Sequence, residues 1–172
     1  VCNWTPWILS NVIDVLLLLE RDGWRRSEGV TRALRMLDSY LAVLPEDGGC
    51  DEGAGYFNMA GAALFDALES VYVATNGRVG FFDEPLIRKI AMFPLHAHIA
   101  GNYFINFADC DAQPLLDGER IARFGMRTKQ PELERFGAWL EGTRASVRSV
   151  DTPQMSRVIQ SLFAQTAHVS EP

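Results

Sequence analysis

A polar loop at residues 50–58 holds the side chains best suited to chemistry. Its sequence is Cys-Asp-Glu-Gly-Ala-Gly-Tyr-Phe-Asn, and it runs directly into an apolar segment at residues 59–74. Glycine permits positive φ angles and close approach of a ligand to the backbone, so such loops often present a reactive group on a helical scaffold. A positioned phenol is able to act as general acid or general base. Tyr56 is therefore the first candidate catalytic residue.

Two adjacent carboxylates in the same loop, Asp51 and Glu52, allow a different chemistry. Glycosidases use a pair of carboxylic acids as general acid and as nucleophile or base. Adjacent residues rarely point at one substrate, however, and acidic residues near a helix N-terminus are favoured by the helix dipole. The pair therefore indicates either a hydrolase or a supported turn.

The histidines and cysteines do not form a metal-binding pattern. His96 and His98 are two apart in an expected helix and face different ways, so we predict no metal site, and we expect His96 to line the cleft. Cys2, Cys50 and Cys110 are an odd number without metal-ligand spacing, which indicates free thiols, buried ones above all. We predict no cofactor.

Composition narrows the class of protein. The 172 residues are enough for one domain with a real core, and we treat residues 1–172 as a single domain. The formal net charge of -6 argues against a nucleic-acid partner, because phosphate binding requires clustered Lys and Arg. No apolar run is long enough to span a bilayer, so we predict no membrane span.

Hydrophobic spacing predicts an all-α fold. The helices are expected at residues 6–21, 27–44, 56–76, 84–100, 118–127, 131–143 and 153–167, with an extended segment at 102–107. The first helix is apolar on all sides, which predicts burial all round as the inner helix of a two-layer array. Pro94 predicts a kink or break near Phe93.

Four motifs, taken in order, resemble the heparinase II/III-like proteins, a family that includes alginate and oligoalginate lyases. The motifs are Cys-Asn-Trp-Thr-Pro-Trp at 2–7, the Asp-Gly-Gly-Cys-Asp-Glu-Gly loop at 47–53 leading to Tyr56, the helix Ala-Gly-Ala-Ala-Leu-Phe-Asp at 60–66, and Asn-Tyr-Phe followed by Asn-Phe-Ala-Asp within 102–109. The resemblance covers roughly residues 1–115.

The resemblance implies an N-terminal (α/α) toroid followed by a β-sandwich, and cleavage of uronic-acid polysaccharides by β-elimination. In the family an Asn or His about fifty residues before a catalytic Tyr binds the uronate carboxylate. Asn3 and Tyr56 match these positions, with a separation of 56 − 3 = 53 residues. Many members use a His beside or in place of this Asn, whereas this chain has Trp4 next to Asn3. The resemblance places a second catalytic His after the toroid, and we expect both it and the β-sandwich beyond this sequence.

We therefore predict a polysaccharide lyase with Tyr56 as acid and base and Asn3 as the group that neutralises the substrate carboxylate. The residues expected to contact substrate are Trp4, Trp7, Glu52, Asn58 and His96. The expected partner is an acidic polysaccharide or oligosaccharide, and the family is often periplasmic or secreted. The alternatives are an (α/α)-toroid glycoside hydrolase that uses Asp51 or Glu52, and a non-catalytic helical carbohydrate-binding or scaffold domain.

Overall fold

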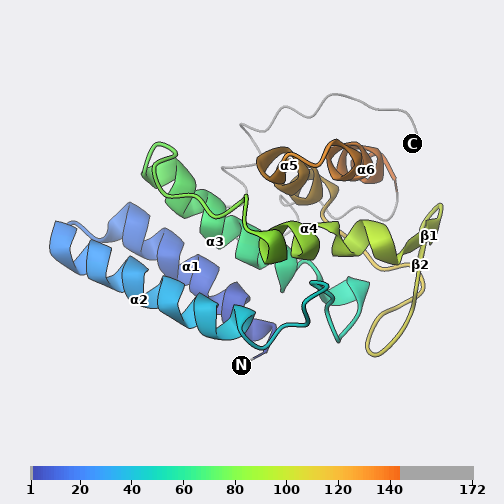
Figure 1. Ribbon diagram of the computed structural model, residues 1–172, viewed down its shortest axis with the longest axis horizontal. Helices are drawn as coiled ribbons and strands as arrows, with labels where there is room; N and C mark the ends of the chain where they lie inside the picture. Colours follow the sequence, from blue (N-terminus) through green and yellow to red (C-terminus); the bar gives the residue numbers. More distant parts are fainter. Residues whose placement is uncertain (1, 144–172) are drawn as a thin grey trace.

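Six α-helices and one short β-hairpin make up residues 2–143, the part of the chain that this computed structural model describes (Figure 1). The helices are α1 (Trp4–Leu19), α2 (Gly23–Leu41), α3 (Gly61–Ala74), α4 (Pro85–Ala97), α5 (Gly118–Thr128) and α6 (Pro131–Glu141), and the strands are β1 (His98–Ala100) and β2 (Tyr103–Phe104). The predicted all-α class is confirmed. The helix predicted at 153–167 lies outside the described residues.

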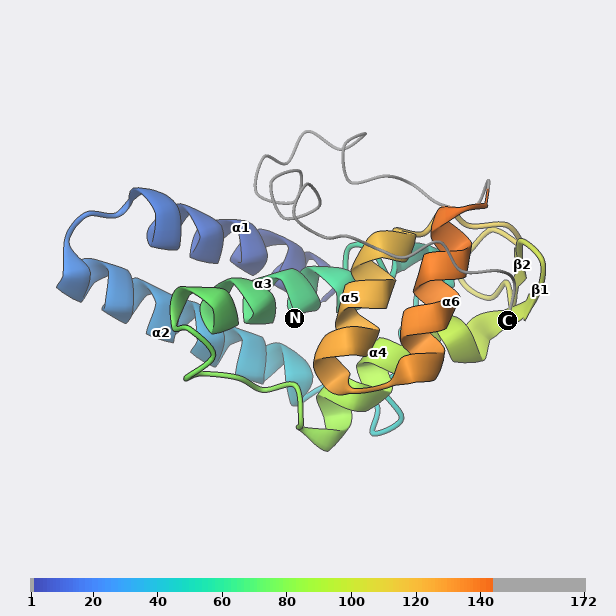
Figure 2. The same cartoon turned by 90° about the horizontal axis from the view of Figure 1, so that it is seen from above.

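The first three helices form one half of the molecule. Figures 1 and 2 show α1 and α2 as an antiparallel hairpin with α3 alongside it, and α1 contacts both of the others. A hydrogen bond of 2.6 Å from Ser70 Oγ to Asp14 Oδ1 joins α3 to α1. Helix α3 therefore lies between this hairpin and the second half of the molecule, where it also meets α4 and α5.

Helix α3, rather than α1, is the helix buried on all sides. Every residue from Gly61 to Val71 is buried. In α1 the side chains of Ile8, Val15 and Leu19 are exposed in the described structure, so the prediction of all-round burial for this helix is wrong for residues 2–143. Among the described elements, α1 packs extensively against only α2 and α3, so these elements leave part of its surface uncovered.

Two helices differ from the predictions, α2 in where it starts and α4 in its course past Pro94. Helix α2 starts at Gly23 instead of Ser27, because Asp22 Oδ1 accepts hydrogen bonds of 2.9 Å from the amides of Trp24 and Arg25. Helix α4 continues through Pro94 and ends at Ala97, so the predicted break near Phe93 does not occur.

The hairpin follows α4 directly. Strands β1 and β2 are antiparallel, and Gly101 makes the turn with a φ of +52°. Strand β2 falls inside the extended segment predicted at 102–107, and this prediction is confirmed in part.

Helices α5 and α6 pack closely at the other end of the molecule (Figure 2). Three glycines lie between α5 and α6: Gly118, Gly125 and Gly137. A Cβ atom added at Gly118 would lie 2.6 Å from the Gly137 carbonyl oxygen, and one at Gly137 would overlap the Ala122 amide nitrogen. The two backbones therefore touch without intervening side chains.

Buried ion pairs join α5 to α3. Asp66 and Arg120 are bonded at 2.5 Å with both side chains almost fully enclosed. One turn along, Glu69 binds both Arg123 and, at 3.1 Å, Arg127. Within the described residues, none of the helices combines the length and hydrophobicity that crossing a bilayer requires.

Candidate functional site

Tyr56 ends a short 3₁₀ turn, Ala54–Tyr56, that precedes α3. Its carbonyl oxygen accepts hydrogen bonds of 3.0 Å from the amides of both Met59 and Ala60, so the backbone is fixed on the way into the helix. The side chain is half-buried, and no hydrogen bond within residues 2–143 holds the phenol hydroxyl. Among the described residues, the hydroxyl therefore has no hydrogen-bond partner, and the backbone that carries it is hydrogen-bonded to the start of α3.

Asn3 lies against the same loop. Its Nδ2 atom donates a hydrogen bond to Glu52 Oε2, across 49 residues of sequence. An ionised carboxylate can only accept, so this contact fixes which end of the Asn3 amide faces Glu52. Asn3 is buried at the N-cap position of α1, but its side chain does not cap the helix. The structure therefore joins the start of α1 to the loop that bears Tyr56.

The loop that bears Tyr56 packs against a second turn, at residues 107–111. Gly53 has a φ of +88°, and a Cβ atom at this position would lie 2.5 Å from Cys110 Cβ. The Gly55 amide donates to Cys110 Sγ at 3.2 Å. Only glycine combines this backbone conformation with this close approach. Cys110 is buried and free, as the cysteine spacing predicted.

Asn58 holds the far side of the loop. Its Nδ2 donates to the Leu115 carbonyl and its Oδ1 accepts from the Asp117 amide, both at 3.0 Å, while Arg120 donates to the Asn58 carbonyl at 3.1 Å. The amide predicted to contact substrate is engaged at both ends. Asn58 therefore positions the segment that leads into α5.

Tyr40, near the end of α2, is a member of this site that the sequence analysis missed. Burial raises the pKa of its phenol well above the ordinary value, and the nearby Cys50, Asp51, Glu52 and Cys2 raise it further. It stays neutral as a result. Its spacing of three residues from the buried Leu37 was the available signal, because positions three apart share a helix face.

The Cys50 thiol also stays protonated. Burial raises its pKa first, and the negative charges of Asp51 and Glu52 add to this, while hydrogen bonds from the Glu52 and Gly53 amides act in the opposite direction. Cys2 is exposed and Cys50 half-buried, so only Cys110 is a fully enclosed thiol. Two groups that interact with the charge of Glu52, the Tyr40 phenol and the Cys50 thiol, are thus neutral.

The two histidines are separated by the end of α4. His96 is an exposed residue of the last helical turn. His98 packs on Phe104, Phe136 and Trp139, with ring centroids 5.1–5.3 Å away, and its Nε2 lies 2.7 Å from the Gly101 carbonyl. Among residues 2–143 no group of three or more His, Cys, Asp or Glu side chains is placed to hold a metal ion.

The two tryptophans predicted to contact substrate lie on the first turn of α1. Trp4, which follows Asn3, is 54% exposed, whereas Trp7 is half-buried. An exposed indole beside a polar group is suited to stacking on a sugar ring. Trp4 is thus the more accessible of the two.

Comparison of the sequence with models of known protein families gives no match, and no curated protein matches it significantly.

Proposed function

We propose that this protein is a lyase that cleaves uronic-acid-containing polysaccharides by β-elimination. The observation that carries the proposal is the hydrogen bond between Asn3 and Glu52, which brings together two parts of the sequence that the motif resemblance pairs. It puts an amide donor on the loop that presents the unbonded Tyr56 hydroxyl. In this proposal the described helices belong to an (α/α) toroid, and the second catalytic His and the β-sandwich are those that the resemblance implies beyond this sequence.

In this proposal Asn3 stabilises the charge that develops on the substrate carboxylate. One N–H of its amide is donated to Glu52, and the proposal assigns the second N–H to the uronate. A proton next to an ionised carboxylate is barely acidic, so a donor that strengthens its bond as the enolate-like state forms lowers the barrier. Glu52 acts as a positioning residue because it fixes the orientation of the amide.

Tyr56 carries the proton transfers. In its phenolate form, Tyr56 takes the proton from C5 of the uronate, the electron pair of the C5–H bond forms the C4–C5 double bond, and the glycosidic oxygen leaves C4 with the bonding pair. The same proton is then returned to the departing oxygen, which a single phenol can do when the two groups leave from one face of the ring. The products are an unsaturated uronate and a free hydroxyl.

Incubation of the full-length protein with polyuronates tests the proposal through the ultraviolet absorbance of the unsaturated product. We expect Tyr56→Phe to abolish the absorbance change and to leave the circular dichroism spectrum unchanged. Tyr103→Phe is the matched control, because this tyrosine is exposed on the β-hairpin. An unchanged rate for Tyr56→Phe would contradict the assigned role.

The same assay separates the alternatives. Release of reducing ends without the absorbance change would indicate a hydrolase that uses Asp51 or Glu52. Retained binding of polyuronates without either product would indicate a carbohydrate-binding or scaffold domain.

A further inference from the structure

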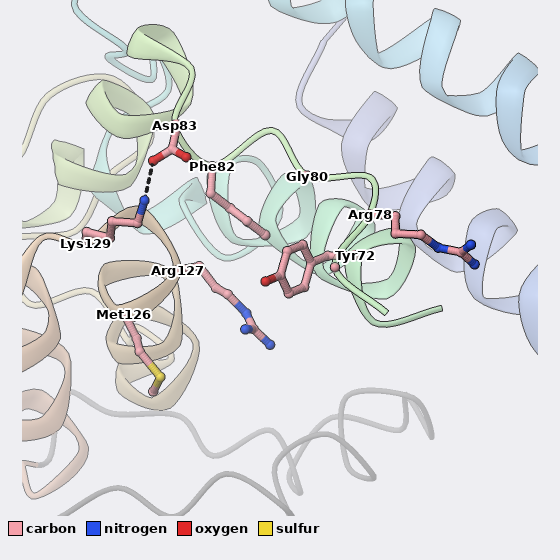
Figure 3. A pocket seen from close by; sticks show the side chains of 9 residues that line it. Tyr72, Arg78, Gly80, Phe82, Asp83, Met126, Arg127 and Lys129 are labelled. Carbon is pink, nitrogen blue, oxygen red and sulfur yellow. Dashed lines mark hydrogen bonds and ion pairs between the residues drawn. The ribbon is translucent and has the colours of Figure 1, made fainter. Parts of the chain in front are cut away.

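A polar pocket lies at the C-terminal end of α3, whereas Tyr56 precedes the N-terminal end of this helix. Figure 3 shows the side chains that line the pocket. Its volume is about 460 Å³, and its wall comes from the end of α3, the following loop and the end of α5. Volumes of this order accommodate small ligands. Because α3 has 14 residues at about 1.5 Å of rise each, the pocket is about 20 Å from the Tyr56 loop. It is therefore a separate site.

The wall is positively charged in a protein whose net charge is negative. It contains three cationic side chains and one carboxylate: Arg78, Arg127, Lys129 and Asp83. The chain as a whole has a formal net charge of -6. A local excess of cations around a hollow concentrates anions there, whatever the net charge of the chain.

Arg127 occupies the centre of the pocket. Its guanidinium carbon lies 4.7 Å from the centroid of the Tyr72 ring, and Figure 3 shows the two side chains side by side. Its Nε donates to Glu69 at 3.1 Å, and the guanidinium has further N–H groups beyond this contact. Glu69 also binds Arg123, which has Glu119 as a second carboxylate partner at 3.2 Å. What Arg127 offers a ligand is therefore its remaining N–H donors, on a side chain that is 31% exposed.

Tyr72 lines the pocket but offers no ring face for stacking. Arg127 covers it at one side, Phe82 meets it edge-on at 5.6 Å, and a Cβ at Gly77 or Gly80 would approach the ring to about 3 Å. An aromatic or sugar ring has no free face to stack on here. Recognition in this pocket therefore depends on charge and hydrogen bonding.

Lys129 supplies a cation at the rim. Its Nζ lies 3.0 Å from Asp83 Oδ1, with both side chains more than 70% exposed. Exposed ion pairs contribute little, so an incoming anion readily displaces Asp83. Lys129 also holds a left-handed conformation, with a φ of 57°, at the helix C-terminus where glycine is usual.

We infer that this pocket binds a small ligand through a phosphate or sulfate group. Such tetrahedral anions accept several hydrogen bonds at once, and two residues that line the pocket, Arg127 and Lys129, carry charged N–H donors for them. The inference does not depend on the lyase proposal, because it uses no residue of the Tyr56 site.

Titration of the full chain with inorganic phosphate, sulfate and glucuronate, followed by amide NMR, tests the inference. We expect saturable shifts with phosphate or sulfate, confined to residues 77–83 and 126–129, and weaker shifts with glucuronate. A preference for phosphate or for sulfate identifies the natural group. Absence of saturation with both anions, or shifts centred on residues 50–58, would overturn the inference.

Two variants and one control complete the test. Arg127→Gln should weaken binding by about tenfold or more, because it removes charge-assisted hydrogen bonds. Lys129→Gly should also weaken binding but raise the melting temperature, because glycine adopts the left-handed conformation without strain. Arg32→Gln, an exposed position on α2, should leave binding unchanged. Equal weakening by Arg32→Gln, or full binding by Lys129→Gly and Arg127→Gln, would contradict the assignment.

Discussion

Glu52 and Asp51 are adjacent in sequence but differ in their surroundings. Glu52 is half-buried and accepts a hydrogen bond from Asn3, whereas Asp51 is exposed. A carboxylate held by an amide is suited to orienting that amide, while an exposed one mainly adds negative charge to its surroundings. If the substrate is the polyuronate proposed above, the two neighbours should act differently: Glu52 orients Asn3, and Asp51 repels the substrate.

We expect Asp51→Asn to lower the KM for polyuronates by about two- to fivefold at low ionic strength, with kcat little changed. The physical reason is the removal of a like charge beside the substrate. The effect should shrink as salt is added, because salt screens exposed charges. Steady-state kinetics at two salt concentrations provide the measurement, with Glu28→Gln, an exposed acidic position on α2, as control. A fall in kcat would instead assign Asp51 to the chemistry.

At the scale of elements, local sequence predicted the positions of the helices but not which of them lies at the centre. Periodicity and turn residues identify α1 to α6 because those signals lie within each segment. Helix α3 carries two carboxylates, Asp66 and Glu69. Both are buried because Arg120 and Arg123 pair with them from 54 residues away. Tyr40 was not predicted to belong to the site, because its acidic neighbours, Asp51 and Glu52, lie outside its own helix.

The contact between α5 and α6 depends on glycine. We expect Gly137→Ala to lower the free energy of unfolding by about 1–3 kcal/mol, because the new methyl group would overlap the Ala122 backbone and force the helices apart. Urea denaturation followed by circular dichroism measures this. Gly142→Ala is the matched control, since a Cβ there would make only an ordinary contact of 3.4 Å. Equal stability of the two variants would show that the helices separate without cost.

At the scale of the whole molecule, a layer of charge runs between its two halves. Glu69 on α3 and Arg123 on α5 are both nearly enclosed, and Glu119 lies 3.2 Å from Arg123 Nε. That separation is within ion-pair range, although the two atoms are not aligned as a hydrogen bond. Since Arg123 is also bound to Glu69, it offsets only part of the cost of burying Glu119. Stability of the assembled halves should therefore depend on pH.

The pKa of Glu119 is raised from its ordinary value of 4.5 to about 7. Burial is the main cause, Arg123 opposes it, and further negative charges add to it: Asp117, Glu141 and Glu69. A carboxyl with a raised pKa in the folded state contributes stability that is fully present below pH 4.5 and is lost as pH rises through 7. Over that window Glu119 should lower the free energy of unfolding by up to about 3 kcal/mol.

We expect Glu119→Gln to flatten the dependence of stability on pH between 4.5 and 7 and to make the protein more stable than the wild type at pH 8. The amide keeps the shape of the protonated acid but does not ionise, so the cost of a buried charge disappears. Urea unfolding of both proteins across this range provides the measurement, with Glu132→Gln, an exposed position on α6, as control. A Glu119→Gln variant less stable than the wild type at pH 8 would mean that the ion pair with Arg123 outweighs the burial of the charge.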